Sequence, residues 1–280
     1  MRTNAIIRIV IFSLVIFILL GILAVGLGIG MFIFRVDSGY SSTYSGTQGS
    51  SGEVSAAEVQ NLNIEWVNGS ITIQPGDTDT ITFAETGNFS DSDQMIWQQS
   101  GDTLTIQFSK PHVSFGIEFD GSKDLVITVP EHWQCQDLDI NSVSAKIEVF
   151  NLTAAEIDLE NVSGNCTFEN CSTNELTVET VSGNVTYEGT LDFMDCSTVS
   201  ANCTLKTNAN PRELSLDSVS GDLILELPED CGFSASIDSM SGSISSDFES
   251  TTAKDYHTYG DGSCRITADT LSGDIIIRKF

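Results

Sequence analysis

The chain has 280 residues and carries 39 acidic against 12 basic residues, which gives a formal net charge of −27 at pH 7. The first 35 residues contain only the bases Arg2, Arg8 and Arg35, so the remainder sets nine bases against 39 acids and carries about −30. Such a domain is repelled by nucleic acid and by anionic lipid, which excludes both as partners. It could attract cations or basic partners, or its acids could keep a long β-surface soluble with its edges unpaired.

Residues 9–34 form an uncharged apolar run that predicts a transmembrane helix. Such a helix would be about 39 Å long, which exceeds the hydrocarbon core of about 30 Å. The run is too long for a signal peptide and no A-x-A-like cleavage site follows it, so we expect an uncleaved, single-pass anchor. Because Arg2 and Arg8 precede the run, the positive-inside rule puts the short tail 1–8 in the cytoplasm and the bulk outside the cell membrane.

Two features accompany this predicted anchor. Gly26 and Gly30 form a G-x-x-x-G motif, through which two helices could approach closely and make a homodimer. Residues 35–57, dominated by Ser, Gly and Thr, are expected to be a flexible tether that lifts the following domain off the membrane.

A repeated frame of apolar residues predicts the fold of the rest of the chain. Around Ser163, apolar residues lie six, four and one positions before and three and five positions after, and Gly164 follows the serine directly. Between Ser144 and Ser241 the frame recurs every 18 to 21 residues, or about 19 per copy. The reference residues of the copies are Asn68, Ser144, Ser163, Ser182, Ser200, Ser220, Ser241 and Ser272.

Each copy of the frame is typical of two short, half-buried strands joined at a corner. Ala145 and Ala201 replace the corner glycine in two copies, so we expect a small residue there rather than a compulsory positive φ. One rung cannot bury its apolar face alone, but rungs stacked at about 4.8 Å bury their faces together and pair as parallel strands. We therefore predict an all-β fold, a single-domain parallel β-solenoid over residues 58–280 behind one transmembrane helix.

Within this solenoid we expect a cap, the rungs and one long loop. Residues 58–130 are predicted to supply an N-terminal meander that caps the first end, and residues 131–280 the repeated rungs. A segment from Glu249 to Ser263 lengthens the last interval, either as a contact site or as a tolerated insertion. The candidate contact residues in this loop are Tyr256, His257, Tyr259 and Asp261.

The rung motif Val-Ser-Gly-[Asp/Asn]-apolar, as in 181–185 and 219–223, resembles the bacterial domain family DUF4097, described as candidate adhesins. The segments Trp66–Asp77 and Leu125–Pro130 fit it too, and the resemblance covers roughly residues 58–280. It implies a β-solenoid on the bacterial cell surface, often beside membrane segments, with links by association to adhesion and envelope-stress signalling. It offers no catalytic residue, and cysteines are more numerous here than we expect of the family.

Seven cysteines lie beyond the predicted anchor, and an odd number leaves at least one free thiol or an intermolecular bond. They are Cys135, Cys166, Cys171, Cys196, Cys203, Cys231 and Cys264. Cys166, Cys196 and Cys203 occupy apolar positions of the frame, which favours buried small hydrophobes. Disulfides between neighbouring rungs, for example Cys171 with Cys196, stay open as an alternative.

The sequence offers no pattern for catalysis, metal binding or a cofactor. Its three histidines have no metal or triad spacing, and no C-x-x-C, G-x-S-x-G, H-E-x-x-H or phosphate loop occurs. One polar column follows the corners and comprises Asn165, Asn184, Asn202, Asp222 and Asp274. We expect its side chains to satisfy turn amides, and a cation-binding ladder is the alternative.

These observations favour a membrane-anchored, extracytoplasmic, adhesin-like interaction domain without catalytic activity. Its partner would be a cell-surface, wall or membrane-protein component. One alternative is a sensory or regulatory module for envelope stress, which would need a membrane partner because the tail is too short to signal alone. A carbohydrate-active β-helix enzyme comes third, because exposed cations are too sparse to accompany clustered acids on one face.

Overall fold

The computed structural model describes residues 46–109, 122–249, 251–253 and 256–280. The predicted tail 1–8, the predicted transmembrane helix 9–34 and residues 35–45 of the predicted tether lie outside these residues. Residues 47–48 and 51–55 of the predicted tether instead form strands that pair in the sheet. Within the described ranges, no helix is long and apolar enough to cross a membrane. The helical elements found there are the short 3-10 turns η1 (Ala56–Glu58) and η2 (Asp91–Asp93).

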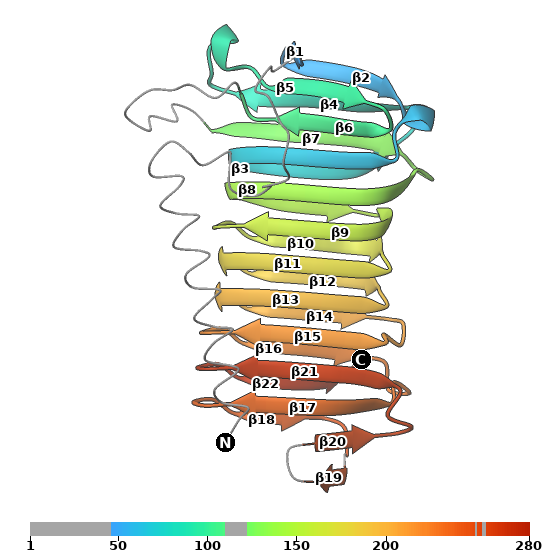
Figure 1. Cartoon of the computed structure of the whole chain (residues 1–280), viewed down its shortest axis with the longest axis vertical. Coiled ribbons are helices and arrows are strands. Elements are labelled where there is room, and N and C mark those ends of the chain that lie inside the picture. Colours follow the sequence, from blue (N-terminus) through green and yellow to red (C-terminus); the bar gives the residue numbers. More distant parts are fainter. Residues whose placement is uncertain (1–45, 110–121, 250, 254–255) are drawn as a thin grey trace.

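Two facing layers of strands stack along one axis, and each rung gives one strand to each layer (Figure 1). The first layer runs in the order β1 (Thr47–Gln48), β5 (Ile96–Ser100), β6 (Thr103–Gln107), β3 (Asn61–Gly76), β8 (Gln134–Phe150), β9 (Thr153–Asn161), β11 (Glu175–Ser182), β13 (Phe193–Ser200), β15 (Glu213–Ser218), β21 (Cys264–Thr270), β17 (Phe233–Ser239), β20 (Tyr256–Tyr259) and β19 (Thr251–Ala253). The second layer runs in the order β2 (Ser51–Ser55), β4 (Thr80–Gly87), β7 (Lys123–Pro130), β3, β8, β10 (Cys166–Ser172), β12 (Val185–Thr190), β14 (Cys203–Thr207), β16 (Leu223–Leu227), β22 (Ile275–Lys279) and β18 (Ile244–Ser246). The long strands β3 and β8 run through both layers.

Parallel pairing holds from β3 to the last rung, and among the described residues antiparallel pairs occur only at the ends of the stack. The prediction of an all-β fold with stacked parallel strands is therefore confirmed. In the segment predicted as a meander, β4 and β5 pair antiparallel with their neighbours, whereas β3 joins the parallel stack with Asn68 opposite Ser144.

The last two rungs do not follow chain order, which the frame did not predict. The rung made of β21 and β22 lies between the rung β15–β16 and the rung β17–β18, as Figure 1 shows. Burial explains this order, because Ile275 and Ile277 of β22 are fully enclosed between two rungs, whereas Ile244 of β18 is 43% exposed at the end. The more apolar copy of the frame thus occupies the interior position.

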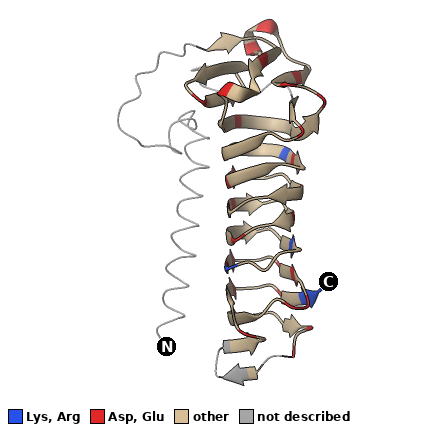
Figure 2. Ribbon diagram, turned by 90° about the vertical axis from the view of Figure 1, so that its right-hand side faces the viewer, with Lys and Arg blue, Asp and Glu red and all other residues tan. Residues whose placement is uncertain are grey.

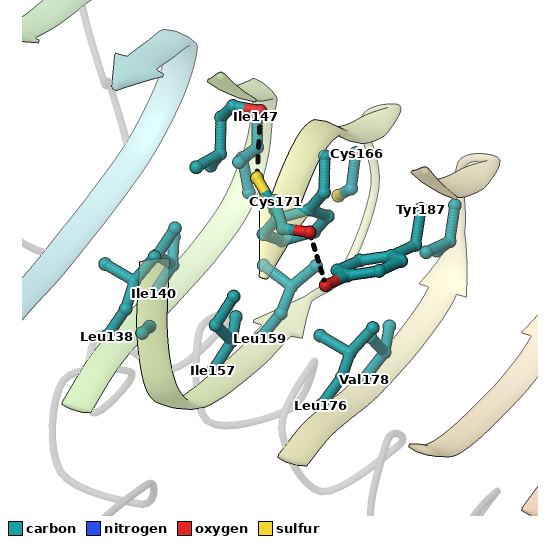
Figure 3. Packing of buried hydrophobic residues seen from close by; sticks show 14 of the residues in the cluster. Leu138, Ile140, Ile147, Ile157, Leu159, Cys166, Cys171, Leu176, Val178 and Tyr187 are labelled. Carbon is teal, nitrogen blue, oxygen red and sulfur yellow. Dashed lines mark hydrogen bonds between the residues drawn. The ribbon is translucent and has the colours of Figure 1, made fainter. Parts of the chain in front are cut away.

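The core lies between the two layers and consists of columns of like residues. The positions six and four before each corner serine, and three and five after it, are buried in the internal rungs, as the frame predicts. Figure 3 shows Leu138, Ile157 and Leu176 in one such column. The one large polar ring in this part of the core is satisfied, because the Tyr187 hydroxyl donates to the carbonyls of Cys171 (3.2 Å) and Thr190 (2.8 Å).

Neighbouring rungs come closest at the corner. Gly183 has a φ of +109°, and a Cβ there would overlap the carbonyl oxygen of Gly164 on the next rung. Gly221 lies outside the left-handed region, yet a Cβ there would overlap the carbonyl oxygen of Ala201. Positive φ is therefore not what the corners share. They share the close backbone approach that the sequence led us to expect.

A buried ion pair joins the strands that close the first end of the stack. Lys123 at the start of β7 is 1% exposed, and its Nζ donates to Glu85 Oε2 on β4 at 2.7 Å. The same ammonium donates to the carbonyls of Asp93 (2.8 Å) and Phe108, and it lies 4.0 Å from the Phe108 ring centroid. Met95 N donates to the other Glu85 oxygen at 2.7 Å. Both charges are thus paired and hydrogen-bonded in a site closed to water.

This buried pair gives the first testable prediction. Lys123→Met leaves the Glu85 carboxylate buried without its cation, so it should lower the free energy of unfolding by about 3–5 kcal/mol. The double variant Lys123→Met/Glu85→Leu should recover part of this loss, because apolar side chains replace both charges while the Met95 amide and the two carbonyls lose their partners. Urea denaturation of the full-length protein, followed by far-UV circular dichroism, measures both changes.

The matched control is Lys206→Met, which breaks an ion pair with Glu188 of the same length, 2.7 Å, whose side chains are 36% and 44% exposed. An exposed pair contributes about 0–1 kcal/mol. If Lys123→Met destabilises the protein no more than Lys206→Met, the buried pair does not hold the first end together.

Candidate functional site

The predicted contact loop forms a hairpin over the last rung. Strand β20 (Tyr256–Tyr259) pairs antiparallel with β17, and β19 pairs antiparallel with β20. His257 and Ser246 are the polar residues lining a cavity of about 300 Å³, whose remaining lining is apolar. The apolar lining residues are Phe233, Ile237, Ile244, Phe248 and Ile277.

Two of the four predicted contact residues hold this hairpin in place. The Tyr259 ring packs against Phe248 at 4.7 Å between centroids, and its hydroxyl donates to the Glu229 carbonyl at 3.2 Å. Asp261 Oδ1 accepts from the Ser263 amide at 3.0 Å, and this hydrogen bonding holds the pKa of the carboxyl below its ordinary value. These contacts give Tyr259 and Asp261 a structural role, and a ligand-binding role for the loop stays a prediction.

The polar column after the corners is a ladder of hydrogen bonds between rungs. Asn165 Oδ1 accepts from the Asn184 amide at 3.0 Å, and Asn184 Oδ1 accepts from the Asn202 amide at 3.3 Å. The ladder continues from Asn202 to Asp222, from Asp222 to Asp274 and from Asp274 to Ser243, at 2.8–2.9 Å. The side chains thus satisfy turn amides, as expected from the sequence. In the part of the chain that the structure describes, no group of three or more His, Cys, Asp or Glu side chains could hold a metal ion.

Two outward-facing rows on the first layer gather carboxylates. The row three positions before the corner comprises Glu65, Asn141, Glu160, Glu179, Ser197, Asp217, Asp269 and Asp238, in register across eight strands. The row five positions before comprises Asn63, Asp139, Asp158, Thr177, Asp195, Ser215, Thr267 and Ser236. Neither described row contains a Lys or an Arg. We call these two rows the acidic face.

The carboxylates of the acidic face crowd one another. Burial and the neighbouring charges of Glu179, Asp158 and Asp139 raise the pKa of Glu160 to about 7. Burial and the charges of Asp217 and Asp238 raise the pKa of Asp269 to about 6. Burial, with repulsion from nearby acids, also raises the pKa of other members of the rows, namely Asp158, Glu179, Asp195 and Asp217. The face therefore concentrates negative charge at a cost in electrostatic free energy.

On the second layer, several outward acids are paired with cations. Its outward Glu188 accepts from Lys206 at 2.7 Å, and Glu148 pairs with Lys146 at 2.8 Å. Glu226 lies 3.7 Å from an Arg278 nitrogen. Figure 2 shows that acids recur along the length of the stack while Lys and Arg are few. On the first layer a cation also pairs with an acid, because Arg265 lies 3.5 Å from Glu213, but both residues lie outside the two rows of the acidic face.

The acidic face is a feature that the sequence analysis did not locate. The net charge of the whole domain does not by itself show where the acids lie within the repeat. The sequence contains a signal for this face, because the positions three and five before each corner alternate with the apolar positions and must point outward. In the internal rungs these two positions hold most of the acids of the first layer.

The comparisons with known proteins bear mainly on the family. Among solved structures, a candidate cell adhesion protein from Clostridium sporogenes matches 82% of this chain and 98% of its own at 11% identity, with a TM-score of 0.39. A candidate adhesin from Bacteroides fragilis (13% identity, TM-score 0.43) and a candidate lipid-binding protein from Parabacteroides distasonis (14%, 0.43) each match 82% of this chain and 96% of their own. The comparison with curated proteins gives no match.

The family assignment rests on the sequence itself. The model of the Toastrack DUF4097 family matches residues 59–191 and again residues 189–278. Together these two matches span almost all of the predicted solenoid, and they include every rung of the stack. The resemblance seen in the rung motif is thereby confirmed. The chain belongs to the Toastrack DUF4097 family.

Proposed function

We propose that this protein is a non-catalytic, adhesin-like interaction module, anchored in the cell membrane by residues 9–34, whose acidic face binds a basic partner outside the membrane. The carrying observation is the acidic face itself, in which nine of the sixteen residues are acids and none is Lys or Arg. Like charges opposed on neighbouring strands destabilise a sheet. The acidic face therefore lowers the free energy of unfolding, and a cationic partner would offset this loss.

The geometry favours an extended cationic surface over a single metal ion. The rows are linear and follow the strand spacing of about 4.8 Å, so their charges point outward side by side rather than converging. None of the described residues forms a group able to hold a metal. A Lys- or Arg-rich polypeptide segment, by contrast, can place a cation opposite each carboxylate along the rows.

The binding test uses a decalysine peptide as the probe and the full-length protein purified in detergent. We expect binding that weakens at least tenfold between about 50 and 200 mM salt, because exposed charges are screened within about 10 Å at 0.1 M. The triple variant Glu160→Gln/Glu179→Gln/Asp217→Asn should weaken binding about tenfold or more, as measured by fluorescence anisotropy.

The control variant removes the same three charges from the second layer, through Glu148→Gln/Glu188→Gln/Glu226→Gln. It should leave binding nearly unchanged, because these acids already pair with Lys146, Lys206 and Arg278. Equal losses in the two triple variants would mean that net charge alone attracts the peptide. The acidic face would then not be the site.

Protonation of the acidic face predicts how stability depends on pH. A carboxyl whose folded pKa is raised binds more protons when folded than when unfolded, so stability is lost as pH rises from about 4.5 to the folded value of about 7 for Glu160. The thermal midpoint should therefore fall between about pH 5 and pH 8. Glu160→Gln should make this decrease of the thermal midpoint smaller and raise the midpoint at pH 8.

The control for this prediction is Glu188→Gln on the second layer, where Lys206 already compensates the carboxylate. The change of its thermal midpoint with pH should match that of the wild type. A Glu160→Gln variant with an unchanged slope would show that the protonation of Glu160, raised by burial and by its charged neighbours, does not affect folding.

The anchoring part of the proposal has its own test. We expect the full-length protein to resist extraction from membranes by alkaline carbonate, because an apolar helix of this length inserts stably. Protease added to the outside of spheroplasts should digest the solenoid, since the positive-inside rule places it there. Release by carbonate, or protection from external protease, would overturn the proposed location while leaving the binding test unaffected.

A further inference from the structure

The seven cysteines fall into two groups when their contacts are compared. All seven are buried thiols, but three of them contact carbonyls or amides rather than another cysteine. Cys135 and Cys171 donate to backbone carbonyls, and Cys166 lies near Asn161 and the Gly164 carbonyl. Burial raises the pKa of these thiols to about 12, 12 and 11 for Cys135, Cys166 and Cys171 respectively. Such thiols are poor nucleophiles.

The other four form two facing pairs. Cys196 on β13 and Cys203 on β14 belong to one rung, and their Sγ atoms lie 2.8 Å apart across the core. The sequence left open a disulfide between Cys171 and Cys196, but these residues lie on β10 and β13 in different layers, and the Cys196 sulfur faces Cys203. The sulfurs of Cys196 and Cys203 need to move only slightly closer together to reach the disulfide bond length of about 2.0 Å.

The second pair lies where the chain leaves the stack and where it returns. Cys231 follows β16 in a turn closed by its amide on the Pro228 carbonyl at 2.9 Å. Cys264 begins β21, and its amide donates to the Gly232 carbonyl at 2.9 Å. The two side chains interact with each other, and this contact lowers the pKa of Cys231 while it raises that of Cys264. Both residues are fully buried.

We propose that Cys196 forms a disulfide with Cys203 and that Cys231 forms one with Cys264. The second bond would join the two ends of the 32-residue excursion from 232 to 263, which contains β17, β18, β19 and β20. That excursion builds the rung that lies out of chain order. The disulfide therefore staples the terminal rung at its base and keeps β21 and β22 inserted above it.

The bond forms by exchange with a small disulfide such as oxidised glutathione. The Cys231 thiolate attacks one glutathione sulfur, and the first glutathione leaves as a thiolate. Cys264 then gives up its proton and attacks the Cys231 sulfur, which releases the second glutathione. Two protein thiols are oxidised, one glutathione disulfide is reduced to two thiols, and the protons pass to the released thiolates. Because both cysteines are buried, exchange takes place before the terminal rung closes over them or while it is locally open.

The experiment counts thiols in the full-length protein after incubation with oxidised glutathione or with dithiothreitol. The protein is quenched in acid, denatured and alkylated with a high-mass maleimide, and labelled species are resolved by mass. Two disulfides consume four of the seven cysteines, so we expect three labelled thiols after oxidation and seven after reduction. Trypsin digestion should yield a linked peptide pair that contains Cys231 and Cys264 and separates on reduction.

Single alanine variants assign the pairs. After oxidation, Cys264→Ala and Cys196→Ala should each show four labelled thiols, since one disulfide is lost and its partner is left free. The matched control Cys166→Ala should show two, because both disulfides remain. Seven labelled thiols in the oxidised wild type, equal counts in Cys264→Ala and Cys166→Ala, or dimers that disappear on reduction would each overturn the proposal.

A second measurement tests the stapling role. Oxidation should raise the thermal midpoint of the wild type by roughly 5–10 °C relative to the reduced protein, because the bond closes a long loop. Cys264→Ala should lose the larger part that comes from the Cys231–Cys264 bond and keep the smaller contribution of the shorter loop closed by Cys196–Cys203. Cys166→Ala should keep the whole difference. Comparing each variant with itself, oxidised against reduced, removes any change in stability caused by the substitution. This outcome does not depend on ligand binding, so it stands apart from the proposed function.

Discussion

In-register parallel pairing between rungs is the constraint on which the rest of this structure depends. When each rung lies directly over the next at the strand spacing of about 4.8 Å, every position of the repeat meets its own counterpart. Apolar positions therefore become core columns, small corner residues become points of close backbone approach, and asparagines become a ladder that satisfies turn amides. The same rule forces the outward acids into rows, where each carboxylate faces its neighbours.

A stack of this kind must also end, and its two ends are closed by different means. At the first end, antiparallel strands cover the parallel rungs and a buried lysine ties β7 to β4. At the second end, a hairpin covers β17, and the other layer ends in the three-residue strand β18. Short or covered edges leave little backbone open to pairing with another chain. The insertion of the C-terminal rung buries apolar surface at this end, because it encloses the more apolar of the last two copies of the frame.

The sequence predicted those parts of the fold that depend on periodicity. The eight corner residues from Asn68 to Ser272 were enough to define the rungs, the role of the asparagine ladder and four of the five apolar positions that are buried. The fifth, directly before the corner, is only half-buried, as at Val181 and Val199, because the chain bends there and buries Thr180 and Thr198 instead. The order of the last rungs could not be predicted, because every copy of the frame pairs equally well with any other and only total burial selects the arrangement. Lys123 could not be foreseen as a core residue, since its partner Glu85 lies 38 positions away in a segment without a repeat.

The two layers together argue that the acidic face is more than a device for solubility. Acids that only keep a surface soluble are cheapest when they are dispersed or paired with cations, as Glu148, Glu188 and Glu226 are on the second layer. On the first layer, Asp217, Asp269 and Asp238 lie on three consecutive strands in one row, and burial together with the charges of its two neighbours raises the pKa of Asp269. Neutral residues fit the same outward position, as Asn141 and Ser197 demonstrate. A charge that the fold does not require, kept where it opposes folding, is explained most simply by a partner that neutralises it.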